Sequence, residues 1–162
     1  MEKIENPFIN FPNYNCFACS PANPWGLKLD FYKDTDSVVS YFHPAENYSG
    51  LPKVMHGGSA GVLMDELIFW AIFVFLEKIA FTTSIEVKYK KYIPTDEKIL
   101  IRGKIVENKR RFFRTIGEIC NNGGELLAQA EGVYFAANLS TLQKSFGLDY
   151  FPEAFIKYCE KG

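Results

Sequence analysis

The longest apolar run in the chain lies near its middle, at residues 59 to about 76. Ten consecutive residues within it, 67–76, are apolar, so a helix made of them has no polar face and must be covered nearly all round. A membrane span needs about 20 apolar residues, whereas this run is preceded by Asp65 and Glu66 and followed by Glu77 and Lys78. The pattern therefore predicts a central helix enclosed by a sheet.

Segments with the alternation typical of strands flank this helix. Two of them, residues 27–32 and 37–43, precede it and predict an antiparallel hairpin. Four follow it, at residues 82–92, 97–108, 110–120 and 125–138. Their short connections predict an antiparallel meander, and Asn122 with Gly123 predicts a type I′ turn between the last two. The order β-β-α-β-β-β-β predicts an α+β fold, in which about six strands wrap around the helix.

The two ends of the chain add little regular structure to this plan. Residues 1–25 contain Pro, Asn or Gly every few positions, which predicts a loop-rich lead without regular elements. Residues 141–162 form a C-terminal appendix, in which a short helix is expected from Pro152. No repeat or long linker divides the sequence, so one domain spanning residues 1–162 is expected.

Composition and charge narrow the class of protein. Apolar residues make up 48% of the chain and charged residues 23%, a balance typical of a globular protein with a core. The net charge of -1 gives no overall attraction to nucleic acid or to an anionic membrane, so neither is expected as a partner. The first fifteen residues contain no apolar run of signal-peptide length, and a cytoplasmic location is therefore expected.

The cysteines raise the question of a metal or redox site. The chain holds Cys16, Cys19, Cys120 and Cys159, too few for a disulfide scaffold, so free thiols are expected. Cys16 and Cys19 form a CxxC pair, but a structural zinc site needs four ligands, and neither the other cysteines nor the two histidines show paired spacing. No strand-to-helix redox turn surrounds the pair. We therefore expect two small buried side chains that fix the lead onto the sheet, with no metal and no cofactor.

The candidate chemistry lies in HGGSAGVLMDE, residues 56–66. Gly57 and Gly58 immediately precede the predicted buried helix, whose first N–H groups lack helical partners and can bind an anion or polarise a carbonyl oxygen. Asp65 lies in a helix otherwise built for burial, where an unpaired carboxylate is costly, so it is a candidate base. Structural alternatives stay open at this point: the glycines can simply close a loop, Asp65 and Glu66 can lie at a wet margin, and His56 can donate a structural hydrogen bond.

This segment resembles the motif of hotdog-fold thioesterases of the PaaI and THEM-like type, in which HGG precedes a helix with an acidic residue. The residues that carry the likeness are His56, Gly57, Gly58, Asp65 and Glu66. CFACSPANPWGLKLDF, IEVKYKKYIPTDEKILIRGKI and ELLAQAEGVYFA are similar to the lead, the strand pair after the helix and the closing strand of such proteins. The resemblance implies a hotdog fold and the hydrolysis of an acyl-CoA-type thioester.

The resemblance also implies a role for each part of the motif. A backbone N–H at the helix start, here that of Gly57 or Gly58, polarises the thioester carbonyl, and the helical carboxylate, here Asp65, activates water or attacks directly. Eight residues separate Gly57 from Asp65, about 12 Å along a helix, so one subunit cannot hold a thioester carbon against both. In these enzymes each site is built at a dimer interface. A homodimer with two sites, or a dimer of such dimers, is therefore expected, with an inactive monomer.

Further residues are expected at the site by the same resemblance. A hydroxyl after the helix often holds the lytic water, and Thr82 is the first candidate here and Thr83 the second. Some relatives use an Asn before HGG, and the nearest in this chain is Asn47. Glu66 is the neighbouring alternative to Asp65, but successive helix residues point about 100° apart, so only one of them should face a given substrate.

The phosphates of CoA need cations, and two groups of basic residues can supply them. They are Lys88, Lys90 and Lys91 in the strand after the helix, and Lys109, Arg110, Arg111 and Arg114 around the following hairpin. A basic hairpin tip is also typical of a plain solvated turn, so the phosphate role stays an open alternative for each of them.

Two other functions compete with hydrolysis. One is a non-catalytic acyl-CoA or fatty-acyl binding protein or sensor on the same fold, although binding alone does not require a buried carboxylate. The other is a hotdog dehydratase, which needs a histidine facing the acid. Only His56 is available for that role, and its place before the glycines does not suit it.

Overall fold

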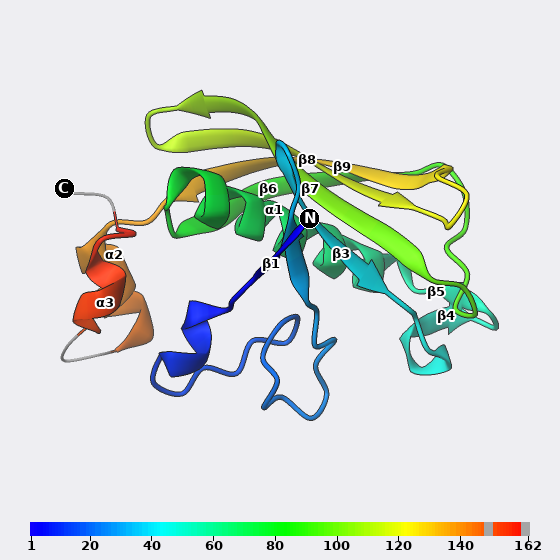
Figure 1. Ribbon diagram of the computed structural model, residues 1–162, viewed down its shortest axis with the longest axis horizontal. Coiled ribbons are helices and arrows are strands. Elements are labelled where there is room, and N and C mark those ends of the chain that lie inside the picture. Colours follow the sequence, from blue (N-terminus) through cyan, green and yellow to red (C-terminus); the bar gives the residue numbers. More distant parts are fainter. Residues whose placement is uncertain (148–150, 160–162) are drawn as a thin grey trace.

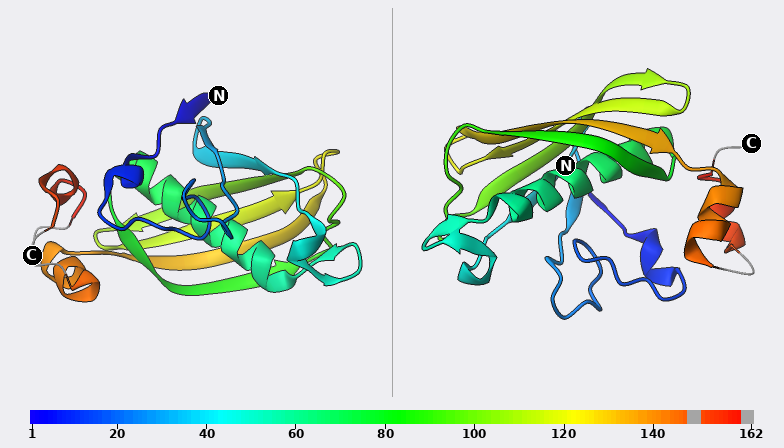
Figure 2. Two further views of the ribbon diagram at one scale, coloured as in Figure 1. Left: turned by 90° about the horizontal axis from the view of Figure 1, so that it is seen from below. Right: turned by 180° about the vertical axis from the view of Figure 1, so that it is seen from behind.

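The central helix α1 spans Gly57–Leu76 in a computed structural model that describes residues 1–147 and 151–159. It begins two residues before the predicted start, with His56 as its N-cap. Figures 1 and 2 show α1 lying across the concave side of a curved sheet, with the lead crossing its other side. The predicted central helix against a sheet is confirmed.

Seven strands form one antiparallel sheet in the order β1-β2-β3-β7-β8-β9-β6. Their bounds are Glu2–Ile4 (β1), Phe31–Lys33 (β2), Ser37–Phe42 (β3), Ala80–Tyr89 (β6), Ile99–Lys109 (β7), Phe112–Cys120 (β8) and Leu126–Ala136 (β9). A separate two-stranded sheet joins β4 (Ser49–Leu51) to β5 (Val54–Met55) just before α1. The α+β class and the predicted strand order along the chain are confirmed.

The ends of the chain hold more regular structure than predicted. The lead is not free of it: β1 pairs with β2, and a 3-10 helix spans Pro7–Asn10. Ile4 packs against the core, which explains why so short a strand is retained. The appendix contains α2 (Leu139–Phe146), which was not predicted and which Asn138 caps by accepting from Thr141 N. The expected short helix follows Pro152 as α3 (Glu153–Ile156).

Two details of the strand connections differ from the prediction. β7, β8 and β9 form a meander, but β6 pairs with β9 at the sheet edge and not with β7. The connection after β6 is held near the helix start by Met55 N–H, which donates to Ile93 O at 2.8 Å, so the chain is led away from β6. The β8–β9 turn is not type I′, because the side chain of Asn121 accepts from Gly123 N and Glu125 N, and φ is positive only at Gly124.

The helix and the sheet approach closely at a glycine. A Cβ added to Gly103 on β7 would lie 2.3 Å from the backbone oxygen of Leu67, so this position accepts no side chain without displacing α1.

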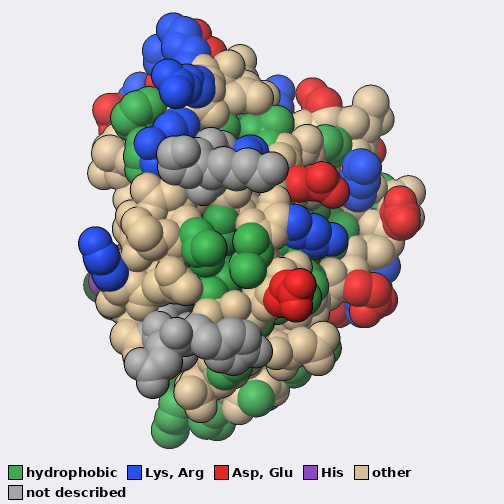
Figure 3. All heavy atoms as spheres, turned by 90° about the vertical axis from the view of Figure 1, so that its left-hand side faces the viewer, with side chains coloured by type: hydrophobic (Ala, Val, Ile, Leu, Met, Phe, Trp, Pro, Cys, Tyr) green, Lys and Arg blue, Asp and Glu red, His purple; other side chains and the backbone are tan. Residues whose placement is uncertain are grey.

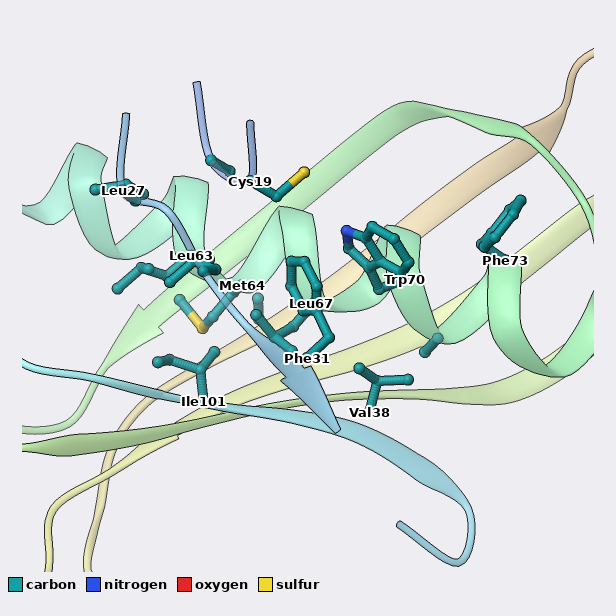
Figure 4. Close-up of a cluster of buried hydrophobic side chains, with 14 of the residues drawn as sticks. Cys19, Leu27, Phe31, Val38, Leu63, Met64, Leu67, Trp70, Phe73 and Ile101 are labelled. Carbon is teal, nitrogen blue, oxygen red and sulfur yellow. The ribbon is translucent and has the colours of Figure 1, made fainter. Parts of the chain in front are cut away.

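By length and composition α1 passes as a membrane span, but its side chains pack into the core shown in Figure 4. Its buried residues are Ala60, Leu63, Met64, Leu67, Ile68, Trp70, Ala71, Ile72 and Phe73. The helix is therefore fixed tightly enough to hold its polar residues in place.

Candidate functional site

The carboxylate of Asp65 is held by two hydroxyl groups. Thr82 Oγ1 donates to Asp65 Oδ1 at 2.7 Å, and Tyr134 OH donates to the same oxygen at 2.5 Å. Thr82 and Tyr134 are Cα partners on the paired strands β6 and β9, which brings both hydroxyls to one point. Asp65 is therefore half-buried and fixed, and the alternative of a loose residue at a wet margin does not describe it.

Tyr134 is the site residue that the sequence analysis missed. Its side chain is fully buried, and burial, with the negative charge of Asp65 adding to it, raises the pKa of the Tyr134 phenol. The phenol therefore keeps its proton and acts as a donor to Asp65. The signal for it was its alternation with Ala128, Ala130 and Gly132 on the face of β9 toward the helix, since a buried tyrosine needs a partner for its hydroxyl.

Of the two candidate threonines, the structure brings Thr82 to Asp65. The pairing of β6 with β9 shifts its register between Thr82 and Ser84, so Thr83 lies in a bulge with an exposed side chain. A bulge re-aims the side chains beside it. This geometry supports the first choice over the second.

The start of α1 leaves one backbone N–H available. His56 Nδ1 accepts from Gly58 N at 2.9 Å, so the Gly58 N–H is used by the cap, and Ser59 N and Ala60 N both donate to His56 O. Among the described residues, the Gly57 N–H has no hydrogen-bond partner. Of the two candidate donors, Gly57 is therefore the one that is free to bind a carbonyl oxygen, and His56 has a structural role as N-cap.

Tyr89, a second residue absent from the predicted site, fixes the position of Gly57. Its hydroxyl donates to Gly57 O at 2.6 Å from the last residue of β6. A Cβ on Gly57 would lie 3.1 Å from the same hydroxyl oxygen. The helix start and the end of β6 are thus held together as one rigid corner.

Asp65 lines the larger of two cavities along β6, with a volume of about 550 Å³. This cavity, called the aromatic cavity below, lies between the lead, the middle of α1 and the start of β6. Its apolar lining includes Phe8, Phe11, Phe69, Ile79, Phe81 and Phe151, and its polar lining includes Tyr14, Cys16, Cys19, Asp65, Glu66 and Thr82. An apolar cavity with a few polar groups at one side is typical of a small-molecule site.

Gly57 lines a different cavity, of about 450 Å³, at the other end of β6. This second one, called the helix-start cavity, is bordered by Val54, Met55, Gly57, Tyr89, Lys90, Lys91, Tyr92 and Ile93. Gly57 does not line the aromatic cavity, and Asp65 does not line the helix-start cavity. The separation expected from the helix geometry is therefore present in the protomer.

Glu66 also borders the aromatic cavity, so both adjacent acids line this cavity, and the expectation that only one of them faces a substrate stays a prediction. The cavity extends around the helix toward the lead, where Trp70 Nε1 donates to Glu66 Oε1 at 3.0 Å and Cys16 Sγ lies 3.8 Å from the same oxygen. Burial raises the pKa of Glu66 to about 7, and the neighbouring Cys16 acts in the same direction. The two acids thus have different partners: Asp65 has the hydroxyls, and Glu66 has Trp70 and the CxxC pair.

Two of the candidate basic residues, Lys90 and Lys91, lie just after the end of β6 and line the helix-start cavity. Lys88 is engaged with Glu86 at 3.3 Å and Glu131 at 3.5 Å. Lys90 is therefore better placed for a phosphate contact than Lys88.

The other basic group lies at the tip of the β7–β8 hairpin, and Figure 3 shows Lys and Arg side chains gathered over that end of the molecule. Lys109 forms an ion pair with Glu107 at 2.8 Å, and the guanidinium of Arg111 lies over the ring of Phe135. Arg110 is exposed at the turn with a positive φ. Asn47 is exposed in the 3-10 helix Glu46–Tyr48, and it lines neither the aromatic nor the helix-start cavity.

Part of this arrangement matches a known protein family. Residues 52–128 match the family model of the thioesterase superfamily. That segment contains the HGG sequence, Asp65 and Thr82, but it ends before Tyr134. No curated protein sequence matches the chain at a significant level.

Several solved structures share the fold. A thioesterase superfamily protein is similar with a TM-score of 0.70 and 23% identity, over 74% of this chain and 62% of that one. Zebrafish thioesterase superfamily member 2 is similar with a TM-score of 0.63 and 19% identity, over 68% of this chain and 82% of that one. A hypothetical thioesterase from Streptococcus pneumoniae TIGR4, solved with coenzyme A, is similar with a TM-score of 0.62 and 20% identity, over 67% of this chain and 87% of that one.

At these identities the likeness to solved structures shows the fold alone. The match to the family model covers residues 52–128, slightly less than half of the chain. The chain therefore has the hotdog fold of these thioesterase structures, and residues 52–128 are similar to the thioesterase superfamily.

Proposed function

We propose that this protein hydrolyses an acyl-CoA-type thioester at a site shared by two copies of the chain. The main support is that the two candidate catalytic groups lie at opposite ends of β6. The unpartnered Gly57 N–H lies beside one end of this strand, and the fixed carboxylate of Asp65 lies beside the other end.

The edge position of β6 supports the sharing of a site. β6 is hydrogen-bonded only to β9, and it is a ten-residue edge whose large side chains Phe81 and Tyr89 are 39% and 51% exposed. A long exposed edge strand is a template for pairing with another chain. If β6 pairs antiparallel with its copy about a two-fold axis, the start of one strand lies beside the end of the other. The aromatic cavity of one subunit then adjoins the helix-start cavity of its partner.

The Gly57 N–H would polarise the thioester carbonyl in this shared site. The N-terminus of a helix carries a partial positive charge, and a donor aimed at the carbonyl oxygen stabilises the negative charge that develops there during attack. The Tyr89 hydroxyl donates to Gly57 O, in the neighbouring peptide, and so helps to hold Gly57 in place. The donor is thus fixed before the substrate arrives.

Asp65 of the partner subunit would supply the base. Both hydroxyls donate to Oδ1, and Oδ2 has no hydrogen-bond partner among the described residues, so Oδ2 faces the substrate unhindered. It takes a proton from water, whose oxygen bonds to the thioester carbon, and the tetrahedral intermediate then expels the CoA thiolate. Direct attack by Oδ2 on the same carbon is the alternative use of this oxygen.

The two cavities suit the two ends of such a substrate. The phenylalanine-rich aromatic cavity fits an acyl or aryl group, while Lys90 at the helix-start cavity can contact phosphate; the neighbouring Lys91 is ion-paired with Glu125. Coenzyme A in the similar structure from Streptococcus pneumoniae supports a ligand of this class. The basic hairpin tip, with Arg110, is a second candidate for phosphate contacts.

A thiol-release screen against short, long and aromatic acyl-CoAs tests the proposal. We expect at least one class to be hydrolysed, and a thermal shift measured on the same panel to follow the preferred class. A binding protein or sensor, the alternative function, would be stabilised by acyl-CoA and would release no thiol. Stabilisation without thiol release across the whole panel would contradict hydrolysis and favour that alternative.

A further inference from the structure

The CxxC pair of the lead and an acid of the central helix meet in the wall of the aromatic cavity. The ligand atoms of Cys16, Cys19 and Glu66 all lie within 4.8 Å of one another. Cys16 Sγ is 3.8 Å and 3.9 Å from the two carboxylate oxygens of Glu66. A tetrahedral zinc ion, with Zn–S of about 2.3 Å and Zn–O of about 2.0 Å, places a sulfur and an oxygen ligand about 3.5 Å apart. The three side chains therefore already approximate the edges of such a site.

The backbone around the pair holds the two cysteines together. Ser20 N donates to Cys16 O at 3.1 Å, which closes the turn between them. Leu27 N and Leu29 N donate to the carbonyl groups of residues 17 and 18, so the turn is fixed to the following segment. Both sulfurs are therefore held beside Glu66 at the wall of the aromatic cavity.

Polar groups from outside the cluster contact its other two members. Asn6 Nδ2 donates to Tyr14 OH at 3.3 Å, and Tyr14 OH forms a hydrogen bond with Cys19 Sγ at 2.7 Å, in which either atom can be the donor. Trp70 Nε1 donates to Glu66 Oε1 at 3.0 Å and orients the carboxylate. Figure 4 labels Cys19 on the lead and Trp70 on α1. Outer hydrogen bonds of this kind are typical of metal sites, where they fix the ligands.

The cluster consists of groups that can carry negative charge, and no positively charged side chain is among the described residues that line its cavity. Among the described residues that line the aromatic cavity, none is Lys, Arg or His, while Asp65 adds a further acid. Two thiolates and a carboxylate in a half-buried wall require a cation to stay ionised together. We propose that Cys16, Cys19 and Glu66 bind a zinc ion, with the fourth coordination position open toward the aromatic cavity. The mixture of thiolate and carboxylate at tetrahedral spacing selects zinc among common divalent cations.

Sequence spacing alone could not reveal this site, because Glu66 lies fifty positions from Cys16. Three protein ligands with one position left for water is the pattern of zinc sites that keep an open position. The ion would also tie the lead to α1 and so shape the aromatic cavity. The proposal does not depend on hydrolysis, since a binding protein can carry the same ion.

Metal binding by the full-length wild-type chain tests the proposal directly. Protein stripped by chelator and kept reduced is titrated with Zn²⁺, and separately with Co²⁺ as a spectroscopic probe. We expect one equivalent of either ion per chain and the absorption of a tetrahedral cobalt-thiolate complex. Absence of binding by the reduced wild type overturns the proposal, as does purification with Cys16 and Cys19 joined in a disulfide that excludes the metal.

Matched variants then identify the ligands. Cys16→Ser with Cys19→Ser should abolish the cobalt-thiolate absorption, whereas Cys120→Ser with Cys159→Ser, which changes the two other free cysteines, should leave it intact. Glu66→Gln keeps both sulfurs and should shift the cobalt spectrum and weaken binding at least about tenfold. A Glu66→Gln spectrum and affinity equal to those of the wild type would overturn the three-residue site. The wild-type titration decides even if a variant fails to fold.

Discussion

Asp65→Asn is expected to lower kcat for thioester hydrolysis by about 10²- to 10⁴-fold, the usual contribution of a general base. The asparagine side-chain oxygen can still accept from Thr82 and Tyr134, which hold Oδ1 in the wild type. The variant therefore keeps the local structure and loses the negative charge and the basic Oδ2. The loss should appear in kcat, measured by thiol release under saturating acyl-CoA.

The exposed Asp96, in the loop after β6, offers a matched control. Asp96→Asn removes the same charge outside both cavities and should leave kcat unchanged. Equal melting temperatures for the wild type and both variants would show that folding is not the cause. If the Asp65→Asn variant hydrolysed the substrate at the wild-type rate, Asp65 would not be the base or nucleophile of the reaction.

Gly57→Pro is expected to lower kcat/KM by about 10²- to 10³-fold, because proline deletes the one free N–H at the helix start. The fold should tolerate the change, since Gly57 is the first residue of α1, where proline is favoured. The preceding His56 has φ -62° and ψ 133°, a conformation compatible with a following proline. Steady-state kinetics with the preferred acyl-CoA would measure the effect.

Gly57→Ala separates the lost N–H from added bulk. In both variants the added Cβ would lie 3.1 Å from the hydroxyl oxygen of Tyr89. Only the alanine variant keeps the N–H of residue 57. We expect the alanine variant to lose far less activity than the proline variant. Equal losses in the two would mean that crowding against Tyr89, and not the missing donor, causes the defect.

The sequence was sufficient for the elements that carry strong local patterns. The apolar run of α1 and the alternation of β7 to β9 predicted those elements within a few residues, because burial and pleating leave a periodic signature. The position of β6 at the sheet edge was not predictable in this way. It depends on the connection through Ile93, which is held by Met55, a contact between segments far apart in the chain.

The candidate site was predictable only in part, for a similar reason. Asp65, Gly57 and Thr82 were found because they lie in or next to one motif. Tyr134 lies sixty-nine positions from Asp65 and carries no motif, so only the β6–β9 register brings it to the carboxylate. The aromatic cavity likewise depends on the lead folding over α1. The turn-forming residues of the lead indicate where the chain bends, but they do not indicate where the lead packs.

Activity recovered by mixing two inactive variants tests the shared site most directly. Asp65→Asn and Gly57→Pro chains are unfolded together, refolded at equal concentration and assayed for thiol release. In a mixed dimer, one site combines the intact Gly57 of one chain with the intact Asp65 of the other. We expect recovery to about one quarter of the wild-type rate, since half of randomly paired dimers are mixed and each has one intact site. A mixture no more active than its two components, under conditions where mixed dimers are shown to form, would contradict it.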